Sequence, residues 1–274
     1  MIDRSTWNLT VPATTSNTLI ETDRLNNGYE SQYFRRNTDG SITFWVPVNG
    51  TRTEDASYPR TELRETQTDG TLSYWYHASA DNYLSAVLSV EQVPSSQKIV
   101  IGQIHSKDQP GSQNDPLLKI QYHYLRGNGR IEALLRKRPG DTEVENILLA
   151  ENVELGERFG YDLRITPSGR LGIVITSNGD DGNLYRELSA YWGNQQLYFK
   201  AGAYIQDNYG AENEGGEFHR PSSAAVEGPA ARPGWERGAQ RAVRRSHGRR
   251  APGYRALTSA GPASRSRPSH REPR

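Results

Sequence analysis

The chain has 274 residues, of which 34% are hydrophobic, 26 are Gly and 15 are Pro, and its net charge is +1. It contains no Cys, which excludes disulfides and thiolate metal sites, and no run of about 18 apolar residues that could span a membrane. The start, Met1 to Arg4, lacks the apolar stretch of a signal peptide, so the sequence as it stands predicts a soluble protein that is not exported. A mature form without its leader would look the same.

Apolar side chains recur at every second position between residues 30 and 206, which is typical of half-buried β-strands. Strands are predicted at residues 42–48, 84–90, 118–124, 159–165 and 171–175, with turns such as Asn49-Gly50 between them. Only residues 141–154 and 184–191 are predicted to hold a short helix. Many short strands separated by turns indicate an all-β sandwich or barrel.

Three of the predicted strand segments carry polar, reactive side chains at alternate positions. Successive side chains of a strand point to opposite faces of the sheet. One face would therefore carry Arg60, Glu62, Arg64, Gln103, His105, Lys200, Tyr204 and Gln206. The opposite face would turn Leu63, Ile104, Phe199, Ala201, Ala203 and Ile205 into a core. Such a polar face suits an anionic, hydroxyl-rich ligand and supplies groups for proton transfer.

The region after Phe218 differs from the rest of the chain. Residues 219–274 contain 13 Arg, no Lys and three Glu, whereas residues 1–218 hold 20 basic and 29 acidic groups. Residues 219–274 have too little apolar surface to offset the entropy lost on ordering. We therefore expect one domain at 1–218 and a disordered tail at 219–274. A basic arm that binds nucleic acid is one interpretation of the tail. We favour the other, a GC-rich gene translated in a shifted frame, and expect no nucleic-acid partner.

The three polar segments resemble the signatures of the alginate lyases of polysaccharide lyase family 7. They are Arg60-Thr61-Glu62-Leu63-Arg64, Gln103-Ile104-His105 and the nine residues from Tyr198 to Gln206, Tyr-Phe-Lys-Ala-Gly-Ala-Tyr-Ile-Gln. They are similar to R-[ST]-E-[LV]-R, Q-[IV]-H and Y-F-K-A-G-x-Y-x-Q, and the resemblance extends over residues 1 to about 218. It implies a β-jelly-roll sandwich with a concave substrate-binding sheet, alginate or a related anionic polysaccharide as partner, and a secreted or periplasmic location.

The resemblance also implies a reaction and roles for individual residues. A lyase cuts alginate by β-elimination: a base removes the proton on C5 of a uronate, and an acid protonates the departing sugar oxygen. Arg60 and Gln103 would neutralise the uronate carboxylate. His105 would be the base on guluronate and Tyr204 the base on mannuronate, with Tyr204 the acid in both cases. The resemblance favours endo action, and within the family Ile at the position of Ile104 goes with activity on guluronate-containing blocks. The substrate-binding residues would be Glu62, Arg64, Lys200 and Gln206.

Each assignment has a structural alternative. Glu62 lies between two arginines, and we favour the interpretation that it only holds them in place. Lys200 and Gln206 could be ordinary solvated strand residues, and Gly202 is expected to leave room for a sugar ring. His77 and His123 fit no motif. Core packing, rather than sugar stacking, is the expected role of most of the large aromatic residues, which are Trp45, Tyr74, Trp75, Tyr76 and Trp192.

Other functions stay open at this point. The chain could be a lyase for another polyuronate such as a glucuronan, a non-catalytic carbohydrate-binding sandwich, or the inactive product of a damaged gene. A base and an acid on facing strands argue against pure binding. The sequence has no phosphate-cradling glycine loop, metal cluster or nucleophilic Ser motif, so no cofactor and no metal is implied, and we expect a monomer.

The last strand is the one departure from the family pattern. Members normally continue after the Glu-Gly-Gly turn with a strand of the type x-V-x-F-x-x-L. Here Glu217-Phe218-His219-Arg220-Pro221 stands in its place. Proline is poorly tolerated in an interior strand, so the sequence puts this strand in doubt. Its loss would open a sheet edge or remove a row of the core.

Overall fold

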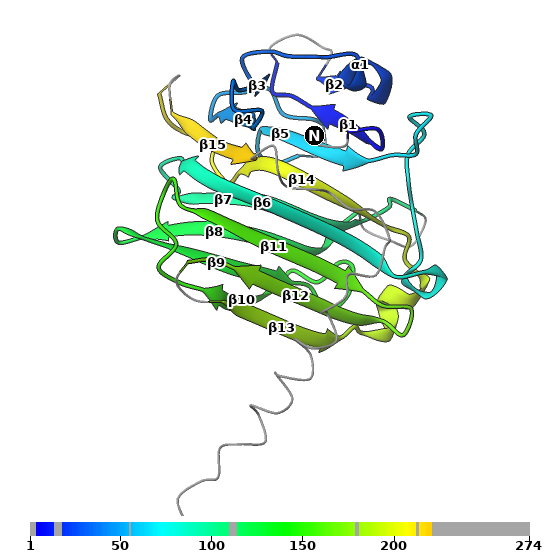
Figure 1. Ribbon diagram of the computed structural model, residues 1–274. Coiled ribbons are helices and arrows are strands. Elements are labelled where there is room, and N and C mark those ends of the chain that lie inside the picture. The colour runs from blue at the N-terminus through cyan, green and yellow to red at the C-terminus, as the bar shows by residue number, and fades with distance from the viewer. Residues whose placement is uncertain are drawn as a thin grey trace, which may run out of the picture. The chain divides into compact units, whose positions relative to one another are not determined.

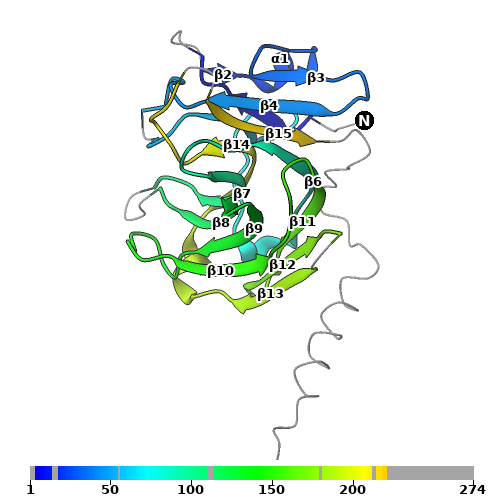
Figure 2. The same ribbon diagram turned by 90° about the vertical axis from the view of Figure 1, so that its left-hand side faces the viewer.

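Two antiparallel β-sheets stack on one another in the computed structural model (Figures 1 and 2). The structure describes residues 4–13, 18–54, 56–109, 114–178, 181–211 and 214–220. All of them belong to one compact unit, residues 1–230. The predicted all-β sandwich is confirmed. The part of the expected disordered tail from residue 221 onward lies outside the described residues.

The first sheet has eight strands in the order β10-β9-β8-β7-β14-β5-β1-β2. Their bounds are β10 Glu145–Ala150, β9 Asn128–Leu135, β8 Pro116–Leu125, β7 Lys98–Ser106, β14 Leu197–Ile205, β5 Arg60–Glu65, β1 Trp7–Thr10 and β2 Leu19–Ile20. Strands that are far apart in the sequence are neighbours here, since β14 pairs with both β7 and β5.

The second sheet has seven strands in the order β13-β12-β11-β6-β15-β4-β3. Their bounds are β13 Gly182–Glu187, β12 Arg170–Thr176, β11 Arg158–Ile165, β6 Asn82–Gln92, β15 Gly215–Arg220, β4 Ile42–Pro47 and β3 Phe34–Arg36. Helical structure in the described part is short: α1 Thr22–Asn26 and the 3-10 turns η1 His77–Ser79 and η2 Ala190–Asn194.

The core lies between the two sheets and is built from the alternating apolar positions. Leu63 of β5, Ile104 of β7 and Phe199 of β14 are buried in it, as the alternation predicted. From the second sheet, Leu84 and Leu88 of β6 are fully buried. Burial of each Leu, Ile or Phe side chain contributes about 1.5–3 kcal/mol to stability. The core between the sheets therefore determines which face of each strand is turned outward.

Both helix predictions were wrong. The segment 141–154 holds β10, and the segment 184–191 holds most of β13 and only the start of η2. In β10, Ile147 and Leu149 pack against the core while Leu148 is 48% exposed, so the segment follows a period of two. The Glu, Leu and Ala residues of β10 favour a helix, but pairing with β9 makes the strand the more stable conformation.

The doubtful last strand is present. β15 pairs with β4 on one side and β6 on the other, and it runs to Arg220, the last residue before Pro221 in the sequence. Phe218 is 1% exposed and meets Phe44 edge-on, with ring centroids 5.0 Å apart. β15 extends two residues past the domain boundary expected at Phe218.

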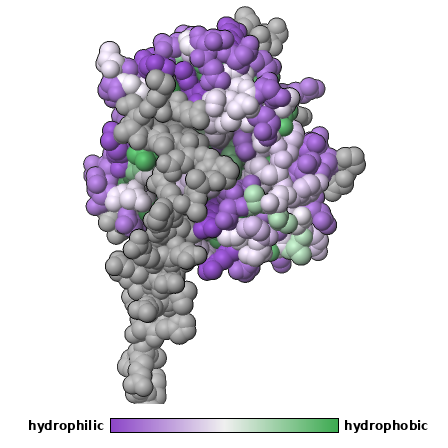
Figure 3. Space-filling model, turned by 45° about the vertical axis from the view of Figure 1, so that its right-hand side comes forward, coloured by the Kyte–Doolittle hydropathy of each residue, from purple (hydrophilic) through white to green (hydrophobic). Residues whose placement is uncertain are grey.

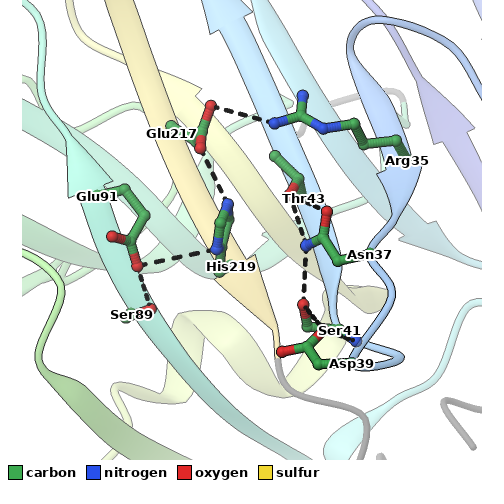
Figure 4. Close-up of polar contacts among 9 residues, drawn as sticks. All are labelled: Arg35, Asn37, Asp39, Ser41, Thr43, Ser89, Glu91, Glu217 and His219. Atoms are coloured by element: carbon green, nitrogen blue, oxygen red, sulfur yellow. Dashed lines mark hydrogen bonds and ion pairs between the residues drawn. The ribbon is translucent and has the colours of Figure 1, made fainter.

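Polar side chains also tie β15 to its neighbours on the outer face of the second sheet (Figure 4). His219 Nε2 lies 2.9 Å from Glu217 and its Nδ1 3.9 Å from Glu91 of β6. Glu217 in turn faces Arg35 of β3 at 3.8 Å. These partly exposed polar contacts contribute little energy each, but they give the polar side chains of β15 partners on the neighbouring strands.

The surface in the view of Figure 3 is mostly hydrophilic, with only small hydrophobic patches. This agrees with sheets that turn one face to the core and the other to water. In the described ranges, no helix combines the length and the apolar character that crossing a membrane requires.

Candidate active site

The three motif segments form β5, β14 and β7, which lie side by side in the first sheet in the order β7-β14-β5 (Figure 1). The pairing register places Lys200 between Gln103 on one side and Arg64 on the other. Tyr204 lies opposite Arg60. The polar residues of three distant segments therefore share one sheet face, whose other side is the core.

Glu62 is the centre of the polar group. Its carboxylate is 1% exposed and lies 2.8 Å from Lys200 Nζ and 3.2 Å from Arg60 Nη1. Gln103 Nε2 donates a hydrogen bond to the second carboxylate oxygen. Burial by itself would raise the pKa of Glu62, but the charges of Lys200 and Arg60 outweigh it and hold the pKa below its usual value. Glu62 is thus an ionised anchor for three donors.

The half-buried His105 adjoins this group on β7. Its Nδ1 lies 2.9 Å from the carbonyl oxygen of Ser106. A carbonyl only accepts, so Nδ1 carries the proton and the lone pair of the neutral ring is on Nε2. Burial, helped by the charge of Lys200, lowers the pKa of His105 to about 3. The imidazole is therefore neutral over the ordinary working range of pH. Its ring stacks on Tyr198, with centroids 5.3 Å apart.

Tyr204 lies at the other end of the group, under Arg60. The Arg60 guanidinium carbon is 4.1 Å from the centre of the Tyr204 ring, a close cation–π contact. Burial raises the pKa of the Tyr204 phenol, and Arg60 acts against this only in part, so the phenol keeps its proton at neutral pH. Within the described part of the chain, the Nε of Arg60 is buried and has no hydrogen-bond partner.

Arg64 does not pair with Glu62, although the two are neighbours on the same strand face. Its guanidinium carbon lies 4.0 Å from the ring centre of Tyr198 and 4.9 Å from that of Tyr74. The expectation that Glu62 holds both arginines is therefore wrong for Arg64. Glu62 instead holds Lys200, from a strand more than 130 positions later in the sequence.

Two residues of the predicted set need comment. The side chain of Gln206 donates to the backbone carbonyls of Tyr204 and Ile205, so its amide turns back on its own strand. Gly202 is required for a different reason from the one predicted. Its φ is +144°, and a Cβ there would lie 2.6 Å from the carbonyl oxygen of Thr61 in β5. The glycine permits close backbone approach at a β-bulge, rather than leaving room for a sugar.

Aromatic and basic residues outside the motifs surround the site. Tyr74, one of the residues weighed between sugar stacking and core packing, meets Tyr198 edge-on at 5.6 Å and lies beside Arg64. Trp192, by contrast, is fully buried as expected. Lys119 of β8 lies 5.7 Å from the Tyr204 ring centre. None of these has a motif of its own, but Lys119 follows the alternation of β8 and could have been placed on this face.

The fold and the comparisons together place the chain among the polysaccharide lyases. A family model described as alginate lyase matches residues 2–224. A curated alginate lyase of Klebsiella pneumoniae is 26% identical over an alignment of 271 positions, and the match covers 77% of this chain and 84% of that protein.

Two solved structures extend this result. An alginate lyase of Pseudomonas aeruginosa is 42% identical, with a TM-score of 0.76, and the match covers 82% of this chain and 99% of that one. A variant of the family 7 alginate lyase A1-II′, in complex with a substrate written GGMG, is 30% identical with a TM-score of 0.68, covering 84% and 96%. The chain belongs to the alginate lyase family. Its fold is the family's jelly roll, and its activity is that of an alginate-degrading lyase.

Proposed function

We propose that the chain cleaves alginate by β-elimination within guluronate-containing blocks, acting at internal bonds. Arg60, Gln103, His105 and Tyr204 carry out the reaction, with Glu62, Lys200 and Arg64 around them. The observation that carries the proposal is the neutral His105, whose Nδ1–H is engaged by Ser106 so that Nε2 holds the free lone pair.

The first requirement of the reaction is to neutralise the substrate carboxylate. The C5 proton next to an ionised carboxylate is very weakly acidic, because its removal leaves two negative charges close together. The guanidinium of Arg60, whose side chain is 13% exposed, and the amide of Gln103 supply the fixed donors that stabilise this charge. Glu62 prevents them from moving, since each contacts its carboxylate.

The second requirement is a base and an acid. His105 Nε2 takes the C5 proton of guluronate, and the C5–H electron pair forms the C4–C5 double bond. The C4–O bond then breaks, and the Tyr204 phenol gives its proton to the departing oxygen. The two residues act on different atoms of the sugar, so the reaction needs no contact between them.

The preference for guluronate rests on Ile104, and it is indirect. Ile104 is fully buried in the core, so it touches no ligand. It acts only through the positions of Gln103 and His105, its neighbours in sequence, whose side chains lie on the polar face. A longer or shorter side chain there would shift both.

The test combines chemistry and substrate range. The purified chain is incubated with poly-guluronate, poly-mannuronate and glucuronan, and the ultraviolet absorbance of the conjugated unsaturated uronate is followed together with product length. We expect absorbance with poly-guluronate first, an early fall in viscosity, and a loss of turnover of about a hundredfold or more in both His105→Ala and Tyr204→Phe. Reducing ends that appear without absorbance would indicate hydrolysis, and faster cleavage of poly-mannuronate would overturn the stated preference.

A further inference from the structure

A second polar cluster lies on the same face of the first sheet, beyond the candidate active site. The outward residues of β8 are Lys119, Gln121 and His123, which alternate with the fully buried Leu118, Ile120 and Tyr122. Lys119 lies directly opposite Gln103 of β7 in the pairing register. The cluster therefore continues the polar face across the next strands of the sheet.

The cluster is organised around a buried carboxylate, as the active-site group is. Glu132 of β9 is 7% exposed and accepts a hydrogen bond from Gln121 Nε2 at 2.9 Å. His123 Nδ1 lies 3.1 Å from its other oxygen, and Asn146 of β10 donates at 3.4 Å. The Gln-x-His spacing of β7 thus occurs again in β8 as Gln121-Tyr122-His123, and in both strands the glutamine donates to a buried glutamate, Glu62 two strands away on β5 and Glu132 on the adjoining β9.

Burying this carboxylate costs free energy that an apolar residue would avoid. No Lys or Arg of the described residues pairs with Glu132; amide groups and an imidazole surround it instead. The Nδ1 of His123 faces Glu132, which leaves its Nε2 for another partner, and its side chain is 17% exposed. Glu132 therefore fixes the directions in which Gln121 and His123 present their remaining polar atoms.

Lys119 connects the two groups. It is half-buried, and within the described residues it forms no salt bridge, while its ammonium lies near the Tyr204 ring at 5.7 Å. Neighbouring strands are about 4.8 Å apart, so Gln121 and Glu132 are roughly two and three strand spacings from Tyr204. A uronate ring linked through positions 1 and 4 is about as long as one such spacing. A polysaccharide that crosses the strands would thus place its next units over this cluster.

We propose that Lys119, Gln121 and His123 form a separate binding subsite for a uronate unit next to the one that is cleaved, with Lys119 holding its carboxylate and Gln121 and His123 its hydroxyl groups. Glu132 is a positioning residue for this subsite. The inference rests on the proposed function for the path of the substrate, but it assigns to these residues affinity and dependence on chain length, and no part in the chemical step.

The experiment compares Lys119→Gln and His123→Leu with the matched control Lys137→Gln, which removes a positive charge from an exposed lysine just beyond β9. Initial rates are measured on guluronate oligosaccharides of increasing length. Both subsite variants are expected to raise KM about tenfold on long chains, as for the loss of one charge-assisted hydrogen bond, with kcat within about twofold of the parent. The rise should be smaller on short chains, and the control should match the parent throughout.

A KM that is unchanged at every length, or a fall in kcat at saturation without a change in KM, would overturn the inference. If His123→Leu fails to fold, Lys119→Gln still decides, because the Lys119 side chain donates no hydrogen bond in the described structure. Binding of oligosaccharides by calorimetry to His105→Ala, with and without Lys119→Gln, separates the two proposals. A parent chain that forms no unsaturated product would defeat the proposed function, whereas an affinity that Lys119→Gln leaves unchanged would defeat only the subsite.

Discussion

Replacing the carboxylate of Glu62 should destabilise the whole fold as well as the site. In Glu62→Gln the shape is kept and Gln103 can still donate to the remaining carbonyl oxygen, but the charge that faces Lys200 and Arg60 is removed. At an effective dielectric constant of 20, the 2.8 Å contact with Lys200 corresponds to a gross attraction of about 6 kcal/mol. The cost of removing these charges from water offsets much of this.

The quantity that matters is the penalty for leaving buried cations unpaired. Removing one partner of a buried ion pair typically costs about 3–5 kcal/mol, and we expect a loss near 3 kcal/mol because Gln keeps one acceptor. The free energy of unfolding is measured by urea denaturation of Glu62→Gln beside Glu187→Gln. Glu187 is 74% exposed and faces Arg170 at 3.9 Å, so the control should lose less than about 1 kcal/mol.

A double-mutant cycle makes the reasoning refutable. If the loss in Glu62→Gln comes from unpaired cations, adding Lys200→Met should recover part of it, because one of those cations is then gone. A loss in Glu62→Gln no larger than that of Glu187→Gln, or a double variant less stable than the sum of the two single changes, would show that Glu62 is not the anchor of the group.

Three further predictions follow from other parts of the molecule. Because the pKa of His105 lies at about 3, the free enzyme should keep its base neutral, and kcat/KM should stay level as pH falls through 6.5 to about 5; a half-maximal point near 6.5 would contradict this. Gly202→Ala should lower the free energy of unfolding, measured by thermal denaturation, by about 2 kcal/mol or more. Gly28 also has a positive φ but has open space around it, so Gly28→Ala should lower the free energy of unfolding by about 1 kcal/mol. A chain that ends at Arg220 should keep the melting temperature of the full chain, whereas one that ends at Glu214 and so lacks β15 should not fold; equal melting temperatures for the two would refute the role given to that strand.

The alternation of side chains was enough to predict the sandwich and the polar face. Leu63, Ile104 and Phe199 are in the core because every second residue of a strand must be, whatever its partners. Partner choice is a different matter. The contact of Glu62 with Lys200 and the stacking of Arg64 on Tyr198 depend on which strands are neighbours, and this follows from packing of the whole chain.

The errors have the same physical origin. The residues of β10 favour a helix when taken alone, and only the edge of β9 makes them a strand. Pro221 suggested a broken strand, but the ladder of β15 needs only the six residues before it. His123 was set aside because it belongs to no motif, yet a hydrogen bond to Glu132 gives it a defined place on the polar face.

The position of β15 has a consequence for how the protein is made. This strand, the last one that the structure describes, fills the gap between β4 and β6, two strands completed more than a hundred residues earlier. Until Arg220 has been synthesised, β4 and β6 each have an edge with unpaired backbone N–H and C=O groups, which can pair with another chain. The second sheet therefore cannot be completed until the end of the domain has been synthesised. Nascent chains should depend on chaperones, or on rapid synthesis of β15, to avoid aggregation.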